Sequence, residues 1–573
     1  MARNSPDQDR DPLVVRLLIY AATLLAALMI IPLLIAIAVQ AGLLDAPLVA
    51  LHAGAIGPLP PAVVIGTIGA IGAGLGLIWF RAPGWLEDRR TDLLVGVTND
   101  HWHPQLRVTD AERDAHWLIT GLPGMGKSGL LTAIAVQCAG RHREALAVID
   151  THGTLIRDVL GLAAAAITAR GSLILEGGNR AWRYGIDPLH CHPGEEPARR
   201  ARAVARAFAT IYGASWSDRI EFYLAGTFQA LIETGFTLAE AGRFLNEADF
   251  RDHVLARCTS ATMREFARTL GRKSARQFAE ETGSVLVKLQ GVLADPSVRA
   301  LLGLAVTDAA YVRHRRARLP GYEPRVVDLF GLLATGSPIL IDLNKRGAGD
   351  FARPVAGLCL ATLLNAGMSR ADLVENDAVE RATIVADELQ SYATDAVVDL
   401  IEEGRKFKLS LCGSCTALAT IPPRIRDALL GARLLIAFQV TTQDAALLAG
   451  QLHRRILHRT GRRGAQGDTS VSPGDRGTWQ ADQLVTTAPR DFLLYSRLRG
   501  GEGRPLHTLD LALAHNRATD DAARDASGRL HGNDRAQVTA EFAVREAWLD
   551  DRLYLATPGP GPASGDEGEN PFL

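Results

Sequence analysis

Residues 116–129 read His116-Trp-Leu-Ile-Thr120, then Gly121-Leu122-Pro123-Gly124-Met125-Gly126-Lys127-Ser128-Gly129. An apolar run leads into a glycine-rich loop, and a helical pattern continues from Ser128 to Ala139. The loop fits G-x-x-x-x-G-K-[ST], the phosphate-binding loop between a strand and a helix. Because the chain has only six lysines, a chance match is roughly one in a hundred. A plain glycine turn is the alternative, but the flanking strand and helix favour a nucleotide site in an α/β fold.

The residue types of this loop indicate what each would do. Backbone N–H groups from Gly121 to Gly129 and the first turn of the helix would surround phosphate oxygens. Lys127 would reach the β- and γ-phosphates, and the Ser128 hydroxyl would hold Mg²⁺. We therefore expect ATP and Mg²⁺ as cofactors.

A second motif, Arg381-Ala-Thr-Ile-Val-Ala-Asp387-Glu388, is an apolar strand that ends in two carboxylates. Asp387 could bind Mg²⁺ through water, and Glu388 could orient and deprotonate the attacking water. An acidic strand end that faces solvent is the alternative. Together with the phosphate loop, the motif predicts Lys127, Asp387 and Glu388 as catalytic residues.

A GTPase is a weaker interpretation. Asp150-Thr-His-Gly153 matches the D-x-x-G motif of GTPases, and Asn344-Lys345-Arg346-Gly347 nearly matches their N-K-x-D motif. Gly347, however, stands where an aspartate would read guanine, and the two motifs are about 190 residues apart.

The rest of the body predicts one α/β domain interrupted by a helical one. Apolar runs separated by helical patterns are typical of a parallel sheet covered on both faces. These runs are Ala145–Asp150, Leu173–Leu175, Pro338–Asp342, Thr383–Asp387, Leu409–Cys412 and Leu434–Val440. Between them the periodicity changes to 3.6, as in Ile220, Leu224, Phe228 and Leu231. We expect an ATPase domain in two parts, 91–196 and 321–515, with an all-helical insertion at 197–320.

The last segment, 516–573, is a polar tail. Val538 to Leu555 could form one amphipathic helix, whereas Ala556 to Leu573 contains four prolines and several acidic residues. This composition predicts disorder for the final part.

The N-terminal part, 1–90, predicts a membrane anchor. Residues 17–39 and 61–80 are free of charged side chains, and each run is long enough to cross a bilayer. The connection at 40–60 has no Lys or Arg, whereas arginines flank both runs, so we expect both termini and the ATPase domain in the cytoplasm. A cleaved signal peptide is the alternative for the first run, but the second run argues against it. The expected location is therefore the inner (cell) membrane.

Composition narrows the possible partners. Hydrophobic residues make up 47% and charged residues 22%, which excludes a disordered chain. The net charge of −1 leaves no global basic field, so DNA would have to be contacted by local patches. Two arginine clusters could do this, with a solvated surface as the alternative. They are Arg313, Arg315, Arg316 and Arg318, and Arg454, Arg455, Arg459, Arg462 and Arg463.

The order of these features resembles the coupling-protein ATPases of type IV secretion and conjugation, which belong to the FtsK–HerA group of RecA-like DNA pumps. The resemblance covers roughly residues 17–509. Besides the two membrane runs and the phosphate loop, it is carried by Val148-Ile-Asp150-Thr-His-Gly153, Ile186-Asp-Pro188-Leu189, Ser337-Pro-Ile-Leu-Ile-Asp342, Asp387-Glu388-Leu-Gln390, Glu403-Gly-Arg405-Lys406-Phe407 and Phe438–Asp444.

The resemblance implies a function. It implies a membrane-anchored RecA-like ATPase, a homo-hexamer that moves DNA or DNA–protein substrate to a type IV secretion channel. A DNA translocase of the same group without a secretion partner is one alternative, and a nucleotide-binding membrane scaffold with little hydrolysis is another. Candidate arginine fingers toward a neighbouring subunit are Arg405, Arg424 and Arg426.

The chain departs from the family at one position. The strand after Gly-Arg-Lys usually ends in a glutamine that senses the γ-phosphate, whereas here Ser414 or Thr416 takes that place. A hydroxyl reaches less far than an amide, which favours the scaffold alternative. Cys412 and Cys415 in this strand form a C-x-x-C pair without a second pair, which favours buried strand cysteines over a redox or metal site.

Overall fold

The computed structural model describes residues 92–98, 105–114, 116–141, 144–176, 181–192, 194–212, 216–304, 306–343, 352–375, 379, 381–449, 481–499, 504–513 and 515–556. The predicted membrane runs, the Asn344–Gly347 motif, the second arginine cluster and residues 557–573 lie outside this set. Among the described residues, no helix combines the length and the apolar character that crossing a membrane requires. The chain divides into two units, 1–90 and 91–573, and the second unit is described here.

The core of this unit is an eleven-stranded sheet with the order β2-β1-β12-β11-β10-β3-β9-β8-β4-β7-β5. From β10 to β5 all neighbours are parallel, whereas β2, β1, β12 and β11 add an antiparallel extension. The strands are β1 (Leu93–Val97), β2 (Gln105–Val108), β3 (Trp117–Thr120), β4 (Ala145–Asp150), β5 (Leu173–Glu176), β7 (Ile339–Asp342), β8 (Ala382–Ala386), β9 (Leu409–Cys415), β10 (Leu434–Ala437), β11 (Asp491–Ser496) and β12 (Arg504–His507).

The predicted parallel sheet is therefore confirmed, and the antiparallel extension was not predicted. Every residue of β3, β4, β8 and β9 is buried, as expected for strands covered on both faces. In β4, Ala147 and Ile149 belong to one apolar cluster, while Leu146 and Val148 belong to the other. α5 (Lys127–Ala139) and α6 (Thr154–Ala169) cover one face, and α17 (Ala352–Met368) and α19 (Asp395–Glu403) cover the other.

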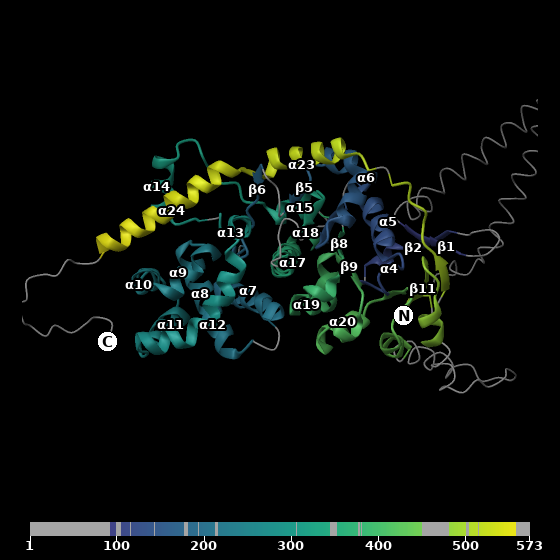
Figure 1. Cartoon of the computed structure of the whole chain (residues 1–573), viewed down its shortest axis with the longest axis horizontal. Helices are drawn as coiled ribbons and strands as arrows, with labels where there is room; N and C mark the ends of the chain where they lie inside the picture. Colours follow the sequence, from purple (N-terminus) through teal and green to yellow (C-terminus); the bar gives the residue numbers. More distant parts are fainter. Residues whose placement is uncertain are drawn as a thin grey trace, which may run out of the picture. The chain divides into compact units, whose positions relative to one another are not determined.

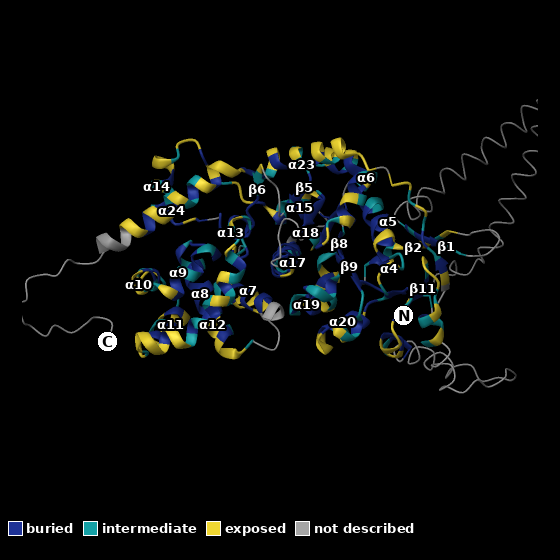
Figure 2. Cartoon of the chain, in the orientation of Figure 1, coloured by how far each residue is buried: buried dark blue, intermediate teal, exposed yellow. Residues whose placement is uncertain are grey.

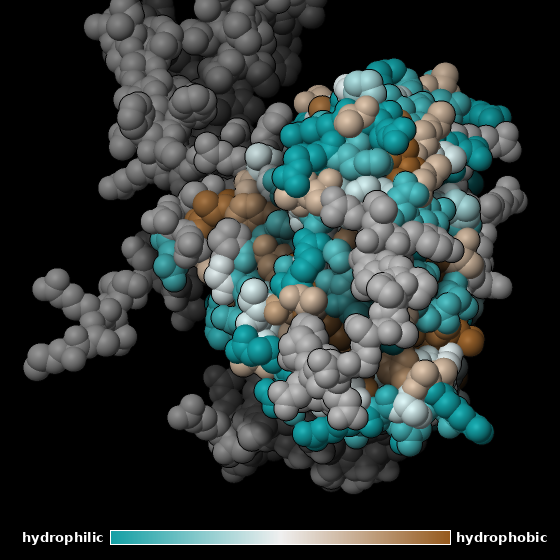
Figure 3. Space-filling view, turned by 90° about the vertical axis from the view of Figure 1, so that its left-hand side faces the viewer, coloured by the Kyte–Doolittle hydropathy of each residue, from teal (hydrophilic) through white to brown (hydrophobic). Residues whose placement is uncertain are grey.

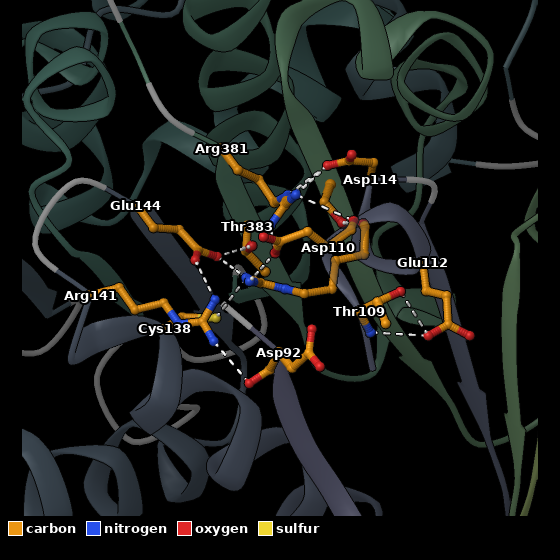
Figure 4. A network of polar contacts seen from close by, with 12 residues as sticks. Asp92, Thr109, Asp110, Glu112, Asp114, Cys138, Arg141, Glu144, Arg381 and Thr383 are labelled. Atoms are coloured by element: carbon orange, nitrogen blue, oxygen red, sulfur yellow. Dashed lines mark hydrogen bonds and ion pairs between the residues drawn. The ribbon is translucent and has the colours of Figure 1, made fainter. Parts of the chain in front are cut away.

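A polar network holds the amino ends of the central strands together (Figure 4). Arg381, just before β8, pairs with Asp110 at 2.7 Å and also with Asp114, both in or beside α4 (Asp110–Arg113). Glu144, just before β4, accepts a hydrogen bond from the Thr383 hydroxyl at 2.8 Å. These carboxylates lie at the sheet edge opposite the phosphate loop, so their role is structural.

Between Pro197 and Arg318 the described residues form helices and no strands. They are α7 (Pro197–Tyr212), α8 (Asp218–Thr234), η3 (Leu238–Glu240), α9 (Ala241–Asn246), α10 (Ala248–Leu255), α11 (Ala261–Gly271), α12 (Ala275–Leu293), α13 (Pro296–Gly303) and α14 (Ala309–Arg318). Several begin at side-chain caps; Ser274, for example, accepts a hydrogen bond from the N–H of Gln277. On the side of the molecule facing the viewer in Figure 3, hydrophilic residues dominate and hydrophobic patches are small.

The C-terminal segment contains the amphipathic helix predicted at Val538–Leu555 and a second helix that the sequence did not predict. α23 (Arg517–His531) lies against α6 and β5, and α24 (Arg535–Ala556) continues along α14 of the helical insertion (Figure 1). Between them, β13 (Asn533–Asp534) pairs with β6 (Trp182–Arg183). We call residues 517–556 the C-terminal strap. Both strap helices have buried residues toward the body and exposed residues outside (Figure 2).

Candidate nucleotide-binding site

The phosphate loop joins β3 to α5 at the carboxyl edge of the parallel strands. Gly126, the N-cap of α5, has a φ of 112°, which a residue with a side chain rarely adopts. At Gly121, an added Cβ atom would lie 2.6 Å from the Cβ atom of Phe438. The glycines therefore allow both the curvature of the loop and its close contact with the chain after β10.

Lys127 is 8% exposed, and its ammonium folds back over the loop. Its Nζ donates hydrogen bonds to the carbonyl oxygens of Gly121 at 2.6 Å and Leu122 at 3.0 Å. Burial lowers the pKa of Lys127, while the charges of Asp387 and Glu388 act in the opposite direction. When a nucleotide binds, the Lys127 ammonium would therefore give up its two carbonyl partners and bind charged phosphate oxygens instead. Ser128 is exposed on the first turn of α5.

Asp387 and Glu388 follow β8, which is separated from β3 by β9 alone. Two strand spacings correspond to about 10 Å. The structure thus brings the predicted carboxylates and the phosphate loop to one edge, with the end of β9 between them. The carbonyl oxygen of Cys415 at this end accepts a hydrogen bond from the N–H of Gly121 at 3.2 Å.

The Asp387 carboxylate is 5% exposed and is held from β9. Its Oδ1 accepts hydrogen bonds from the Ser414 hydroxyl at 2.5 Å and from the N–H of Glu388 at 3.0 Å. Burial raises the pKa of Asp387, and the hydrogen bond from Ser414 lowers it in part. Ser414 therefore fixes the orientation of the carboxylate that would face Mg²⁺.

Glu388 has an unusual backbone conformation, with φ 50° and ψ 43°. A non-glycine residue in this left-handed region is uncommon, and such residues concentrate at functional sites. Its side chain contacts His152, with 2.7 Å between Glu388 Oε2 and His152 Nε2. Sequence reasoning missed this contact, although His152 lies inside the Asp150-Thr-His-Gly153 motif.

Asp150 has a structural role in that motif. It is fully buried, and its carboxylate accepts hydrogen bonds from the N–H groups of His152 at 2.8 Å and Ile156 at 3.1 Å. Burial raises the pKa of Asp150, and these backbone hydrogen bonds act against that shift. The aspartate therefore shapes the turn after β4 and the start of α6.

Of the two hydroxyl residues at the end of β9, Ser414 is the one that contacts the Asp387 carboxylate. Thr416 lies one residue beyond the strand, and its N–H donates a hydrogen bond to Oε1 of Gln390 at 3.3 Å. The cysteines of this strand are buried free thiols, and burial raises the pKa of Cys415 to about 12. Within the described ranges no group of three or more His, Cys, Asp or Glu is placed to hold a metal ion.

Two further residues support the phosphate loop, and sequence reasoning missed both contacts. The N–H of Leu122 donates a hydrogen bond to the carbonyl of Gln439 at 2.7 Å. The N–H of Arg490 donates one to the carbonyl of Met125 at 2.9 Å, with Arg490 at a φ of 70°. Gln439 follows the apolar run of β10, which was a usable signal, whereas nothing in the sequence marks Arg490.

The structure removes one residue, Arg315, from the arginine patch that the sequence predicts in α14. Arg315 is 3% exposed and pairs with Glu323, and Arg316 pairs with the same carboxylate at 2.5 Å. Burial removes the charge of Arg315 from a DNA patch, whereas Arg313, Arg316 and Arg318 are exposed, Arg316 beside Glu323.

The three candidate arginine fingers differ in exposure. Arg405 is exposed, and Arg424 is 69% exposed at 3.6 Å from Asp395. Arg426 is 21% exposed at 3.6 Å from Asp427. Arg405 and Arg424 are therefore more accessible to a neighbouring molecule than Arg426.

No family model matches this chain, and no curated protein does. Among solved structures, the chain is similar to the bacterial conjugative coupling protein TrwB in complex with sulphate, with 13% identity, 75% of this chain and 94% of that chain covered, and a TM-score of 0.48. For TrwB in complex with ADP and Mg²⁺, the identity is 13%, 75% of this chain and 93% of that chain are covered, and the TM-score is 0.47. For VirB4 of Thermoanaerobacter pseudethanolicus, the identity is 15%, 74% of this chain and 97% of that chain are covered, and the TM-score is 0.45. These identities are low, and the three TM-scores are below 0.5.

Proposed function

We propose that this chain is a membrane-anchored ATP-hydrolysing motor of the type IV secretion and conjugation class, which moves DNA or DNA–protein substrate to a secretion channel. The observation that carries the ATPase assignment is the pairing of two motifs at one sheet edge. The phosphate loop follows β3, and Asp387 and Glu388 follow β8, with only β9 between these strands. A nucleotide bound by the loop would therefore have its terminal phosphate next to two carboxylates.

The residues present fit ATP and Mg²⁺. The loop provides backbone N–H groups, a lysine whose partners are exchangeable carbonyls, and the exposed Ser128 at the start of a 13-residue helix. Mg²⁺, when bound, would neutralise phosphate charge. Ser128 and Asp387 would hold it, Lys127 would bind the β- and γ-phosphates, and Glu388 would orient a water molecule and accept its proton.

The membrane and assembly parts of the proposal rest on sequence. The runs at 17–39 and 61–80 would anchor the protein in the inner membrane as a multi-pass protein, with both termini and the ATPase domain in the cytoplasm. TrwB is a conjugative coupling protein, the class that the motif order resembles, and one TrwB structure contains ADP and Mg²⁺. A homo-hexamer would let Arg405 or Arg424 complete the site of a neighbouring subunit.

The proposal is tested by DNA-stimulated ATP hydrolysis of the full chain in detergent or a lipid nanodisc. Lys127→Ala should lose turnover by orders of magnitude, because the charge that holds the phosphates is removed. Glu388→Gln should still bind ATP, while turnover falls by roughly two to four orders of magnitude. Lys406→Ala is the matched control, since Lys406 is 72% exposed and contacts Glu403 rather than the loop. Equal turnover in wild type and Lys127→Ala would disprove the assignment.

One observation favours the scaffold as a second candidate. In this structure Glu388 contacts His152 rather than a group of the phosphate loop. A scaffold predicts that ATP binds, that turnover stays low and that DNA does not raise it. The same assay therefore separates the two candidates.

A further inference from the structure

The general base that the proposed function assigns has a partner outside the phosphate site. Glu388 Oε2 lies 2.7 Å from His152 Nε2. His152 belongs to the turn between β4 and α6, and Glu388 follows β8. The two residues are far apart in sequence, and the parallel pairing of β4 with β8 brings them together.

The order of the strands determines on which side of β8 the Glu388 side chain is held. The strands run β3-β9-β8-β4, so the phosphate loop lies on one side of β8 and His152 on the other. β3 is two spacings from β8, about 10 Å, and β4 is one spacing away on the opposite side. A Glu388 carboxylate held by His152 is therefore held on the side away from the phosphate loop.

The backbones of both residues are fixed, so only the side chains are left to move. The N–H of Glu388 donates to Asp387 Oδ1 at 3.0 Å and to Ser414 Oγ at 3.3 Å. The N–H of His152 donates to Asp150 Oδ1 at 2.8 Å. The His152 and Glu388 side chains are 37% and 31% exposed, which leaves room for a rotamer change without backbone movement.

His152 also lines a cleft of about 860 Å³ that separates this edge of the sheet from the C-terminal strap. Arg517 and Arg524 of α23 form part of the opposite wall. The cleft is open to solvent beside His152, so the histidine has space to leave Glu388.

We propose that His152 is a positioning residue that holds Glu388 in a resting position, off the phosphate loop, until substrate or a neighbouring subunit releases it. The inference rests on the proposed ATPase function and adds its regulation. A ring N–H on a carboxylate is a charge-assisted hydrogen bond, which must be broken before Glu388 can reach water beside the γ-phosphate. Basal hydrolysis is then slow, and stimulation consists of breaking this contact.

The test measures kcat and KM for ATP with the full chain, with and without DNA. His152→Ala should raise kcat without DNA by about tenfold, equal to about 1.4 kcal/mol, and leave KM unchanged. With DNA its kcat should match the wild type, so the stimulation ratio falls by about tenfold. His152→Gln keeps an N–H donor and should return the basal kcat most of the way to the wild-type value.

Two further variants isolate the contact. His515→Ala is the matched control, because His515 lines the same cleft but lies 3.5 Å from Asp158 and does not contact Glu388. It should leave basal turnover unchanged. His152→Ala combined with Glu388→Gln should be as inactive as Glu388→Gln alone, because the gain acts through the glutamate.

The outcomes separate this inference from the proposed function. A basal kcat that is unchanged or lower in His152→Ala overturns the inference, while the motor stands if Lys127→Ala abolishes turnover. If neither the wild type nor His152→Ala hydrolyses ATP, the proposed ATPase function itself fails. A basal kcat that rises in His515→Ala as much as in His152→Ala also overturns the inference, because the effect would then belong to the cleft in general.

Discussion

Ser414→Ala removes one hydroxyl and leaves the strand intact. Ser414 is fully buried in β9, and its Oγ donates to Asp387 Oδ1 at 2.5 Å and accepts from the N–H of Glu388 at 3.3 Å. Without it, the Asp387 carboxylate keeps the Glu388 N–H but loses its side-chain donor. Because that carboxylate is 5% exposed, water can replace the lost donor only in part.

The structure sets the size of the effect. A buried hydrogen bond to a charged acceptor contributes about 1.5–3 kcal/mol to stability, so the free energy of unfolding should fall by about 2 kcal/mol. Removing the partner of a metal-binding carboxylate typically lowers metal affinity about 10- to 100-fold. The Mg²⁺ concentration for half-maximal ATP turnover should therefore rise by about that factor, because Asp387 is the proposed Mg²⁺ residue of β8.

Urea unfolding and a Mg²⁺ titration of ATP turnover measure the two effects. Ser410→Ala is the matched control, because Ser410 is 1% exposed in the same strand and donates to the carbonyl of Arg113 at 2.5 Å, at the opposite end of β9. It should lose about 1 kcal/mol of stability and keep the wild-type Mg²⁺ dependence. The same Mg²⁺ dependence in Ser414→Ala and wild type would refute the role of Ser414 in orienting Asp387.

Three other predictions concern the amino edge, a buried histidine and the end of β9. Arg113→Met should lower the free energy of unfolding by about 3 kcal/mol, because the buried Glu144 loses its buried ion-pair partner and keeps only Arg141 at 3.3 Å; a loss below about 1 kcal/mol in urea unfolding would contradict this. Burial, aided by the charge of Arg433, lowers the pKa of His116 from 6.5 to about 4. Between these two pH values the unfolded state therefore binds a proton that the folded state does not bind. Stability should fall by roughly 3 kcal/mol between pH 6.5 and 4, and His116→Gln should remove that part of the slope in unfolding measured across this range. Thr416→Gln should raise basal ATP turnover about tenfold if Thr416 occupies the place of the usual glutamine. Unchanged turnover with intact ATP binding would show that Thr416 only ends the strand and does not sense the γ-phosphate.

The parallel part of the sheet could be predicted because its strands are buried on both faces. β4 and β8 are therefore mainly apolar runs, and motifs follow at their carboxyl ends. At the outer edge of the antiparallel extension this signal is missing. β2 has four residues and only one of them is buried, so its position depends on pairing with β1 rather than on its own composition.

The site could be predicted only as far as residue types and strand ends allow. The motifs identify Lys127, Asp387 and Glu388, but they do not specify which way a side chain turns at the end of its strand. The contact of Glu388 with His152 depends on the order of the strands and on the left-handed backbone of Glu388. That conformation could not be predicted, because the residue is not a glycine. Ser414 belonged to a pair of candidates until the structure placed its hydroxyl on Asp387.

The C-terminal strap shows why a polar sequence can still be ordered. β5 is an edge strand of the sheet, and the N–H of Ile174 in this strand donates to the Ser527 hydroxyl of α23 at 2.7 Å, so the strap satisfies a backbone group that the sheet leaves unpaired.

Beyond that edge, one arginine in each strap helix fixes the position of that helix. Arg524 lies 3.1 Å from Asp342 at the end of β7, and Arg545, 1% exposed, pairs with Glu240 of the helical insertion at 3.0 Å. A buried charge is tolerated only where its partner meets it, so each arginine allows one docking position. The position of α23, and with it the far wall of the cleft beside His152, therefore depends on both the sheet and the insertion.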